Sequence, residues 1–171
     1  MLESGGVTDH FVETLGLNPF QSGLMFWLTG LRAKEVSARM SNSSSSGVDM
    51  YDAASVTFDN GAIGVVSGAA TLPSDVKFQL DVRIFGSEGL LTLDIDRERL
   101  DVFRHDGNHQ HIPVPPGEGA YDCDGPPNRF VELIKGEGTN DSPGEVGARS
   151  VELIDAMFES VAEGNVPVMA T

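Results

Sequence analysis

The sequence has a single cysteine, few basic residues and no long apolar segment, and each absence excludes a class of protein. Cys123 has no partner for a disulfide within the chain, which is consistent with a reducing compartment. Its neighbours Asp122 and Asp124 disfavour the thiolate that a nucleophilic or redox-active cysteine requires. We therefore expect Cys123 to have no chemical role.

Basic residues are far outnumbered by acidic ones. The 171 residues contain 11 lysines and arginines against 26 aspartates and glutamates, which gives a formal net charge of -15. This charge repels the phosphates of nucleic acids and of anionic membranes. No apolar run approaches the roughly 20 residues that span a bilayer, and the first residues do not have the pattern of a signal peptide. We expect a cytoplasmic protein that binds neither nucleic acid nor membrane.

The motifs of common active sites are also missing. There is no nucleophile elbow, no Walker loop and no glycine-rich turn between a strand and a helix that could bind a dinucleotide. Gly86 and Gly89 come nearest to a phosphate loop. The residues on both sides of them alternate between apolar and polar, as in a hairpin, whereas a phosphate loop must open a helix. We therefore predict a turn at residues 86–89.

The periodic patterns that are present predict a helix, a series of strands and two further helices. The first helix begins at Asn18-Pro19 and ends at Gly30. Extended runs follow, the first at 33–40, and Asp59-Asn60-Gly61 joins two of them as a tight turn. Regular alternation stops in the proline- and glycine-rich stretch 113–127, where we expect the sheet to end.

Apolar residues at helical spacing predict the buried face of each helix. In the first helix this stripe consists of Phe20, Leu24, Trp27 and Leu28. A short helix is expected near residues 128–135. The last helix should begin with a capping box at Ser142-Pro143-Gly144-Glu145 and end at Gly164. Its predicted stripe consists of Val151, Ile154, Met157, Phe158 and Val161.

This order of elements predicts an α+β fold, as a single domain over residues 1–171. The sheet should be open-faced and mostly antiparallel, with the helices packed on one face. Nothing in the pattern indicates a parallel crossover. The helices are too few to cover both faces, so one broad and partly apolar face should remain open, and we expect a homodimer or larger assembly through it.

Three histidines lie close together in the segment "RHDGNHQHI". His105, His109 and His111, with Asp106, could form a zinc site in a loop. No cysteine pair, no HExxH motif and no further ligand of fixed spacing accompanies them. A solvated hairpin tip without a metal is the better interpretation.

Asp9 and His10 are the candidates for acid/base catalysis. They follow Ser4-Gly5-Gly6, a run of small residues that would let the backbone approach a ligand closely. An adjacent aspartate cannot easily orient its neighbouring histidine, so an ordinary surface pair is the alternative.

Four short motifs occur in an order that is typical of one enzyme family. They are "ESGG" followed by a helix ending in "FWLTG", then "VTFDNGAIGVVSGAA", "VRIFGSEGLLTLD" and "SVELIDAMFESVAEGNVPV". In these motifs the chain resembles the C-terminal domain of the glucose-fructose oxidoreductase / inositol dehydrogenase (Gfo/Idh/MocA) family over nearly its whole length. The resemblance implies the dihydrodipicolinate reductase-like C-terminal fold, which shapes the substrate pocket and builds subunit interfaces.

In that family a separate N-terminal Rossmann domain binds NAD or NADP. The resemblance therefore implies NAD or NADP for a full-length relative, no cofactor bound by this chain alone, and a cofactor domain that another chain could supply. The family's catalytic histidine is replaced by Phe20. His10, with Asp9, could take its place only if the segment from Asp9 to Gly16 folds back.

Two hypotheses follow. The chain is part of an NAD(P)-dependent oxidoreductase that acts on a sugar, polyol or similar small molecule, and is inactive in isolation. Alternatively, it is a catalytically inert, stand-alone binding or assembly module. The absence of a nucleotide fingerprint favours inactivity of the chain by itself.

Overall fold

The computed structural model of the chain describes residues 11–15, 19–41, 49–71, 73, 75–76, 80–95, 97–118 and 123–171. Within these ranges there are nine strands: β1 (Phe11–Leu15), β2 (Ala33–Ser41), β3 (Tyr51–Phe58), β4 (Ile63–Ala69), β5 (Asp81–Gly86), β6 (Gly89–Asp94), β7 (Arg99–Arg104), β8 (Gln110–Pro113) and β9 (Val168–Met169). The three helices in the same ranges are α1 (Pro19–Thr29), α2 (Gly125–Ile134) and α3 (Gly144–Ala162).

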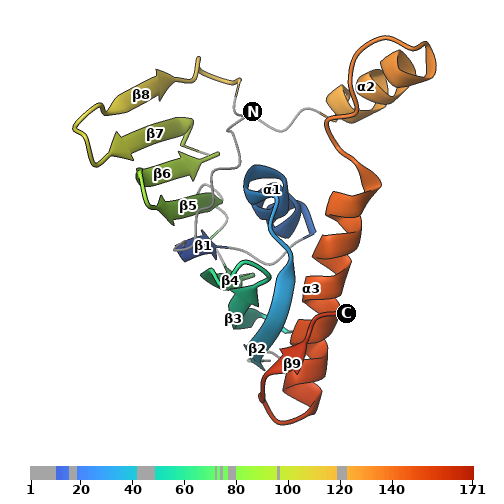
Figure 1. Cartoon of the computed structure of the whole chain (residues 1–171). Coiled ribbons are helices and arrows are strands. Elements are labelled where there is room, and N and C mark those ends of the chain that lie inside the picture. Colours follow the sequence, from blue (N-terminus) through green and yellow to red (C-terminus); the bar gives the residue numbers. More distant parts are fainter. Residues whose placement is uncertain are drawn as a thin grey trace.

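The nine strands form one sheet in the order β8-β7-β6-β5-β1-β4-β3-β2-β9. In Figure 1, α1 and α3 lie on the same side of this sheet, whereas α2 stands apart from it. The predicted α+β class and the open-faced, mostly antiparallel sheet are confirmed. None of the described helices is both long and apolar enough to cross a membrane.

One pair of strands differs from the expected topology. Every pairing between the described strands is antiparallel except that of β1 with β4, which is parallel. β1 joins the meander β2-β3-β4 to the meander β5-β6-β7-β8. The β1 sequence FVETL does not alternate between apolar and polar residues, so the sequence did not predict β1 or its parallel partner. One edge of the sheet ends at β8, where the sequence predicted it. The two-residue β9 extends the other edge, because it pairs with β2.

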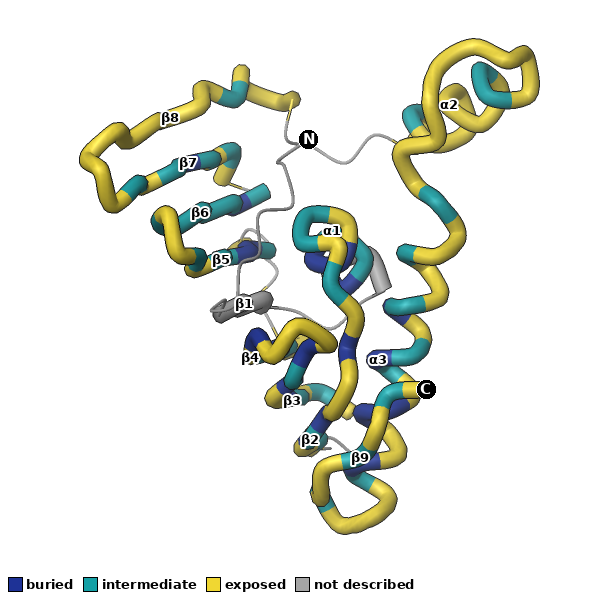
Figure 2. The backbone as a smooth tube through the Cα atoms, viewed as in Figure 1, coloured by how far each residue is buried: buried dark blue, intermediate teal, exposed yellow. Residues whose placement is uncertain are grey.

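The hydrophobic core lies between the helices and one half of the sheet. It contains Met25 and Phe26 from α1, Leu153 and Met157 from α3, and side chains from one face of the strands: Ala33, Val36, Ala38, Ala54, Val56, Phe58, Val66 and Val82. Figure 2 shows buried positions concentrated in β2 to β4, α1 and α3, whereas β8 and α2 are mostly exposed. The two ends of the molecule are therefore packed very differently.

Two hydrogen-bonded side chains, the buried Ser160 and the partly exposed Arg149, fix the position of α3. Ser160 Oγ accepts a bond of 2.9 Å from the Ala38 N–H of β2 and donates one of 2.6 Å to the Val166 carbonyl. Arg149 Nη1 donates to the Gly30 carbonyl at 3.0 Å and so satisfies a carbonyl at the end of α1. These bonds attach α3 to both the sheet and the first helix.

The buried faces of α1 and α3 differ from the predicted stripes. Trp27 is 54% exposed, whereas Phe26 next to it is 1% exposed. On α3, Val151 and Phe158 are exposed, and the buried residues are Ser150, Leu153, Ala156, Met157 and Ser160. Small residues allow a helix to approach its neighbours closely, so the buried face of α3 includes serine and alanine, which a hydrophobic pattern does not detect.

The C-terminal end of α3 was predicted correctly, whereas its N-terminal cap was not. The capping box is wrong, because Pro143 occupies the N-cap position in an extended conformation and makes no side-chain cap hydrogen bond. The end at Gly164 is confirmed. Gly164 has a φ of 88° and donates to the Val161 carbonyl at 3.2 Å. A positive φ costs glycine little, which explains the residue at this position.

The hairpin predicted at residues 86–89 is confirmed. β5 pairs with β6 in a register that places Gly86 opposite Gly89. Gly89 has a φ of 152°, and a Cβ atom there would lie 2.0 Å from the Phe103 carbonyl oxygen and 2.9 Å from Arg104 Cα. Glycine is required here because the backbone of β7 lies against this residue.

We expect Gly89→Ala to destabilise the chain more than Gly107→Ala. Gly107 also has a positive φ, 84°, but nothing lies within 4 Å of its added Cβ. Alanine at Gly107 should therefore cost only the backbone strain, about 1 to 2 kcal/mol. At Gly89 the β7 backbone must also move. Urea unfolding of both variants measures the difference, and equal losses would contradict the close approach of β7.

Candidate functional site

The acid/base candidates Asp9 and His10 lie outside the described residues, so their role stays a prediction. Phe20, where the resemblance implies a histidine in the family, is the second residue of α1. Cys123 is exposed. Neither acid/base candidate therefore lies among the described residues. We looked for a functional site on the surface of the described sheet instead.

The histidine-rich segment forms the β7–β8 hairpin, and its histidines have separate surroundings. The ring of His109 packs edge-on against Phe103 with 5.6 Å between centroids. His111 lies in β8, with Nδ1 2.6 Å from Asp101 Oδ1 in β7. His105 is in the turn between the strands. In the part of the chain that the structure describes, no group of three or more His, Cys, Asp or Glu residues is placed to hold a metal ion.

The side of the sheet opposite to α1 and α3 is here called the open face. Side chains alternate between the two sides of a strand. Because Val56, Val66 and Val82 belong to the core beneath the helices, the residues one position away from them point to the open face. The strand registers then show which of these residues lie beside one another.

Apolar side chains follow one line across the open face. Ile63, Phe85, Leu90 and Phe103 come from β4, β5, β6 and β7, and we call them the apolar row. Phe85 is paired with Leu90, and Leu90 with Phe103. Phe11 of β1 holds the register position between Ile63 and Phe85. Ile63, Phe85 and Phe103 are all exposed, which is unusual for large apolar side chains that lie along one line of a sheet.

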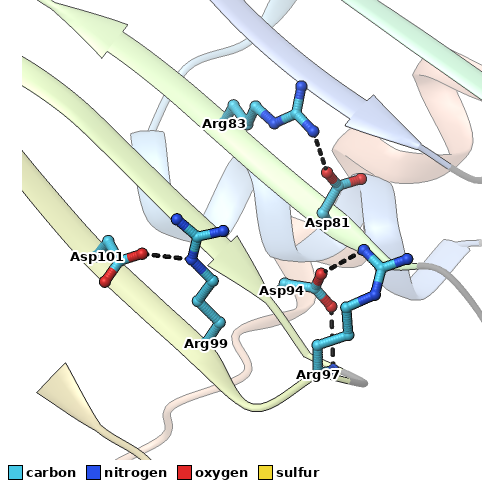
Figure 3. A network of polar contacts seen from close by, with 6 residues as sticks. All are labelled: Asp81, Arg83, Asp94, Arg97, Arg99 and Asp101. Atoms are coloured by element: carbon cyan, nitrogen blue, oxygen red, sulfur yellow. Dashed lines mark hydrogen bonds and ion pairs between the residues drawn. The ribbon is translucent and has the colours of Figure 1, made fainter. Parts of the chain in front are cut away.

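Charged side chains occupy the other end of the same strands. The charged cluster consists of Asp81, Arg83, Asp94, Arg97, Arg99 and Asp101 (Figure 3). Arg83 Nη2 is 2.9 Å from Asp81 Oδ2, and Arg97 Nη1 is 2.8 Å from Asp94 Oδ2. The Arg97 N–H also donates to Asp94 Oδ1 at 3.0 Å. Arg99 Nε donates to Asp101. Each carboxylate is thus paired with an arginine of its own strand or the adjoining turn.

The carboxylates of this cluster are buried although they lie on the open face. Asp81 is 8% exposed, and Asp94 and Asp101 are each 6% exposed. The arginines beside them remain partly exposed. Their aliphatic parts can cover the carboxylates while their guanidinium groups reach water. Asp81 and Asp94 are direct neighbours across β5 and β6, where two negative charges repel unless each is compensated.

Asp101 is hydrogen-bonded to both Arg99 and His111. The hydrogen bond with His111 and then the hydrogen bond from Arg99 lower the pKa of Asp101 below its ordinary value. Its charged form is therefore favoured in the folded state. The carboxylate contributes stability above the pKa of the unfolded chain, and this contribution disappears as the pH falls through the lower folded value.

We expect Asp101→Asn to lower the free energy of unfolding at pH 7, because the charged partner of His111 and Arg99 is removed. The difference from the unsubstituted chain should become smaller below about pH 4, where aspartate in the unfolded chain is protonated. Urea unfolding at pH 7 and pH 3 measures both differences. An equal loss at the two pH values would contradict this role of Asp101.

The chemistry of the open face suits contact with another protein surface. The paired oxygens of the charged cluster already accept from arginines, and this cluster contains three of the chain's 11 basic residues, Arg83, Arg97 and Arg99, beside three carboxylates. Charge is thus nearly balanced here on a chain whose net charge is -15. A balanced surface beside an exposed apolar row opposes association less than the rest of the molecule does.

The charged cluster was not predicted from the sequence, although part of its signal is visible there. Asp81-x-Arg83 and Arg97-x-Arg99-x-Asp101 repeat with the period of two that marks a strand. What the sequence does not show is the register, which places Asp81 opposite Asp94 and Asp94 opposite Arg99. Without the strand register, the sequence predicts these residues to be ordinary solvent-exposed positions.

Comparison with known proteins shows which family and which folds the chain is similar to. Residues 15–92 match the family model described as the GFO/IDH/MocA C-terminal domain. No curated protein matches the chain. An oxidoreductase from Sinorhizobium meliloti has a similar fold, with a TM-score of 0.73 and 15% identity, over 96% of this chain and 57% of its own.

Two further solved structures are similar over nearly the whole of this chain. Levoglucosan dehydrogenase in complex with NADH and L-sorbose matches with a TM-score of 0.68 and 17% identity, over 98% of this chain and 59% of its own. The WlbA dehydrogenase from Bordetella pertussis, in complex with NADH and UDP-GlcNAcA, matches with a TM-score of 0.68 and 15% identity, over 98% of this chain and 56% of its own. The chain thus spans between 55% and 60% of the length of such structures. Residues 15–92 are thus similar to the GFO/IDH/MocA C-terminal domain, and the described fold is similar to the matched part of these oxidoreductases.

Proposed function

We propose that this chain is the substrate-pocket and oligomerisation domain of an NAD(P)-dependent oxidoreductase that acts on a sugar, polyol or similar small molecule. The observation that carries the proposal is the match of residues 15–92 to the family's C-terminal domain. Similar structures were solved with NADH together with L-sorbose or UDP-GlcNAcA, which supports a sugar-like substrate. The single domain over residues 1–171 and the cytoplasmic location stay predictions.

The isolated chain should bind NADH or NADPH no better than weakly. Its 171 residues contain no G-x-G-x-x-G motif, and the dinucleotide pyrophosphate needs the free N–H groups of the helix that such a motif opens. Titration calorimetry with each cofactor tests this expectation, with intact levoglucosan dehydrogenase as the positive control. Micromolar binding of either cofactor would reveal a site that the sequence and the fold do not suggest.

The experiment that tests the proposed function joins the chain to a cofactor-binding part. The part of levoglucosan dehydrogenase that this chain does not match would be fused to residues 1–171, and NADH formation would be followed with a panel of sugars and polyols. Turnover of any of them supports the oxidoreductase, and His10→Ala would then test the acid/base candidate. A fusion that binds NADH but oxidises none of the panel favours the inert binding or assembly module.

We also propose that the open face pairs with the open face of a second copy. The apolar row supplies side chains that burial would stabilise, and the nearly balanced charged cluster beside it limits repulsion between two acidic chains. A two-fold pairing places the same residues of both copies in contact, as a self-complementary surface requires. The helices lie on the other side of the sheet and do not obstruct this contact (Figure 1).

A further inference from the structure

α2 is a helix with three exposed large apolar residues. None of its residues is buried. Phe130, Val131 and Ile134 are 64%, 46% and 71% exposed, and we call these three residues the α2 ridge. Their spacing places them on one side of the helix. Figures 1 and 2 show α2 away from the sheet, beyond the N-terminal end of α3.

Such a helix needs a packing partner. An isolated helix of fewer than about 12 residues is marginal in water, because its first turn is costly to form, and most helices in proteins are stabilised by packing of an apolar face. α2 has ten residues and no side-chain N-cap hydrogen bond. Its pair of Arg129 and Glu132, 2.9 Å apart, is exposed, and such a pair contributes only about 0.2 to 0.5 kcal/mol. Local interactions therefore do not replace the missing contact.

The size of the α2 ridge limits what its partner can be. A ten-residue helix is about 15 Å long, and two such helices in two-fold contact would bury much less than the roughly 1,200 Å² of a stable interface between separate proteins. A second copy of the chain, bound through α2 alone, is therefore disfavoured. A domain held nearby by further contacts needs less area, because inter-domain interfaces can be as small as about 600 Å².

The comparisons indicate what such a domain would be. Structures that match 96% to 98% of this chain extend well beyond the matched region, since the match covers only 55% to 60% of their length. Some of them hold NADH. We propose that the α2 ridge is the docking surface for a dinucleotide-binding domain, whose contact orders α2. This proposal rests on the proposed function, because it takes the cofactor domain of the oxidoreductase as the partner.

Hydrogen exchange of the α2 amides tests the proposal on the complete 171-residue chain. We expect residues 128–134 to exchange within about tenfold of the rate of an unstructured peptide, at every protein concentration. Protection that rises with concentration would instead identify a second copy as the partner. Strong protection that does not depend on concentration would show that α2 packs within its own chain. Either result overturns the proposal.

The fusion with the NADH-binding part of levoglucosan dehydrogenase provides the complementary measurement. Exchange in α2 should slow by at least about tenfold there, and the double variant Phe130→Ser with Ile134→Ser should abolish this protection. Val166→Ser is the matched control, because Val166 is an exposed apolar residue outside the ridge. Unprotected α2 in a fusion that binds NADH would overturn the docking surface. Protected α2 in a fusion that oxidises no sugar would instead contradict the proposed function and leave the docking surface standing.

Discussion

The double variant Ile63→Arg with Phe103→Arg is expected to be a monomer under conditions in which the unsubstituted chain is a dimer. Both residues belong to the apolar row, and a two-fold contact would bury both of them in each copy. Arginine brings a charge that must lose its hydration on contact without gaining a partner. We expect the dissociation constant to rise by at least about 100-fold, which corresponds to about 2.8 kcal/mol.

Arginine is a better test than an acidic residue because it moves the net charge of -15 toward zero. Loss of the dimer therefore cannot be attributed to greater repulsion between the chains. Phe158→Arg is the matched control, since Phe158 is exposed on α3, on the helix side of the sheet. This control should still dimerise. Light scattering at tens of micromolar protein measures the mass of all three proteins.

Salt should strengthen the dimer. Repulsion between two acidic chains acts over distance and is screened within about 8 Å at physiological ionic strength, whereas apolar burial acts only at contact. The ion pairs of the charged cluster lie within one copy, so screening them does not separate the two copies. A monomer at tens of micromolar in both low and high salt would refute pairing through the open face.

The strands and turns that were predicted could be recognised because their signals are local. Alternation through Val82 and Ile84, and again through Leu91 and Leu93, marks two strands, and the glycines between them mark a turn. The reason for Gly89 itself was not local. It depends on the backbone of β7, which the register brings against it and which the sequence does not show.

Non-local placement also explains what could not be predicted of the candidate site. The sequence predicted an open, partly apolar face because some strands have small or apolar residues on both sides, as where Ala62 and Val66 alternate with Ile63 and Val65. In the structure Ala62 and Val66 are buried, and Ile63 begins a row that continues into β5, β6 and β7 through β1. β1 was not predicted, so the row could not be either.

Helices posed a different difficulty, since α1 and α3 are each apolar on more than one side. Leu24 and Trp27 have the same spacing of three residues as the buried Ser22 and Met25, and only the position of the helix against β1 and α3 leaves Trp27 exposed. On α3 the stripe of Val151 and Phe158 is the more hydrophobic one, yet it is exposed. Hydrophobic spacing therefore located both helices correctly but not their rotation about the helix axis.

This rotation of α1 can be tested with two neighbouring residues. Phe26→Ala should lower the free energy of unfolding by about 3 to 5 kcal/mol, because it removes a fully buried aromatic side chain and leaves a cavity. Trp27→Ala should change it by about 0.5 kcal/mol or less, because that side chain is 54% exposed. Urea unfolding of both variants at one protein concentration excludes any effect of dimerisation on the comparison. The stripe predicted from the sequence gives the opposite order, so a larger loss for Trp27→Ala would show that α1 is rotated toward Phe20 and Leu24.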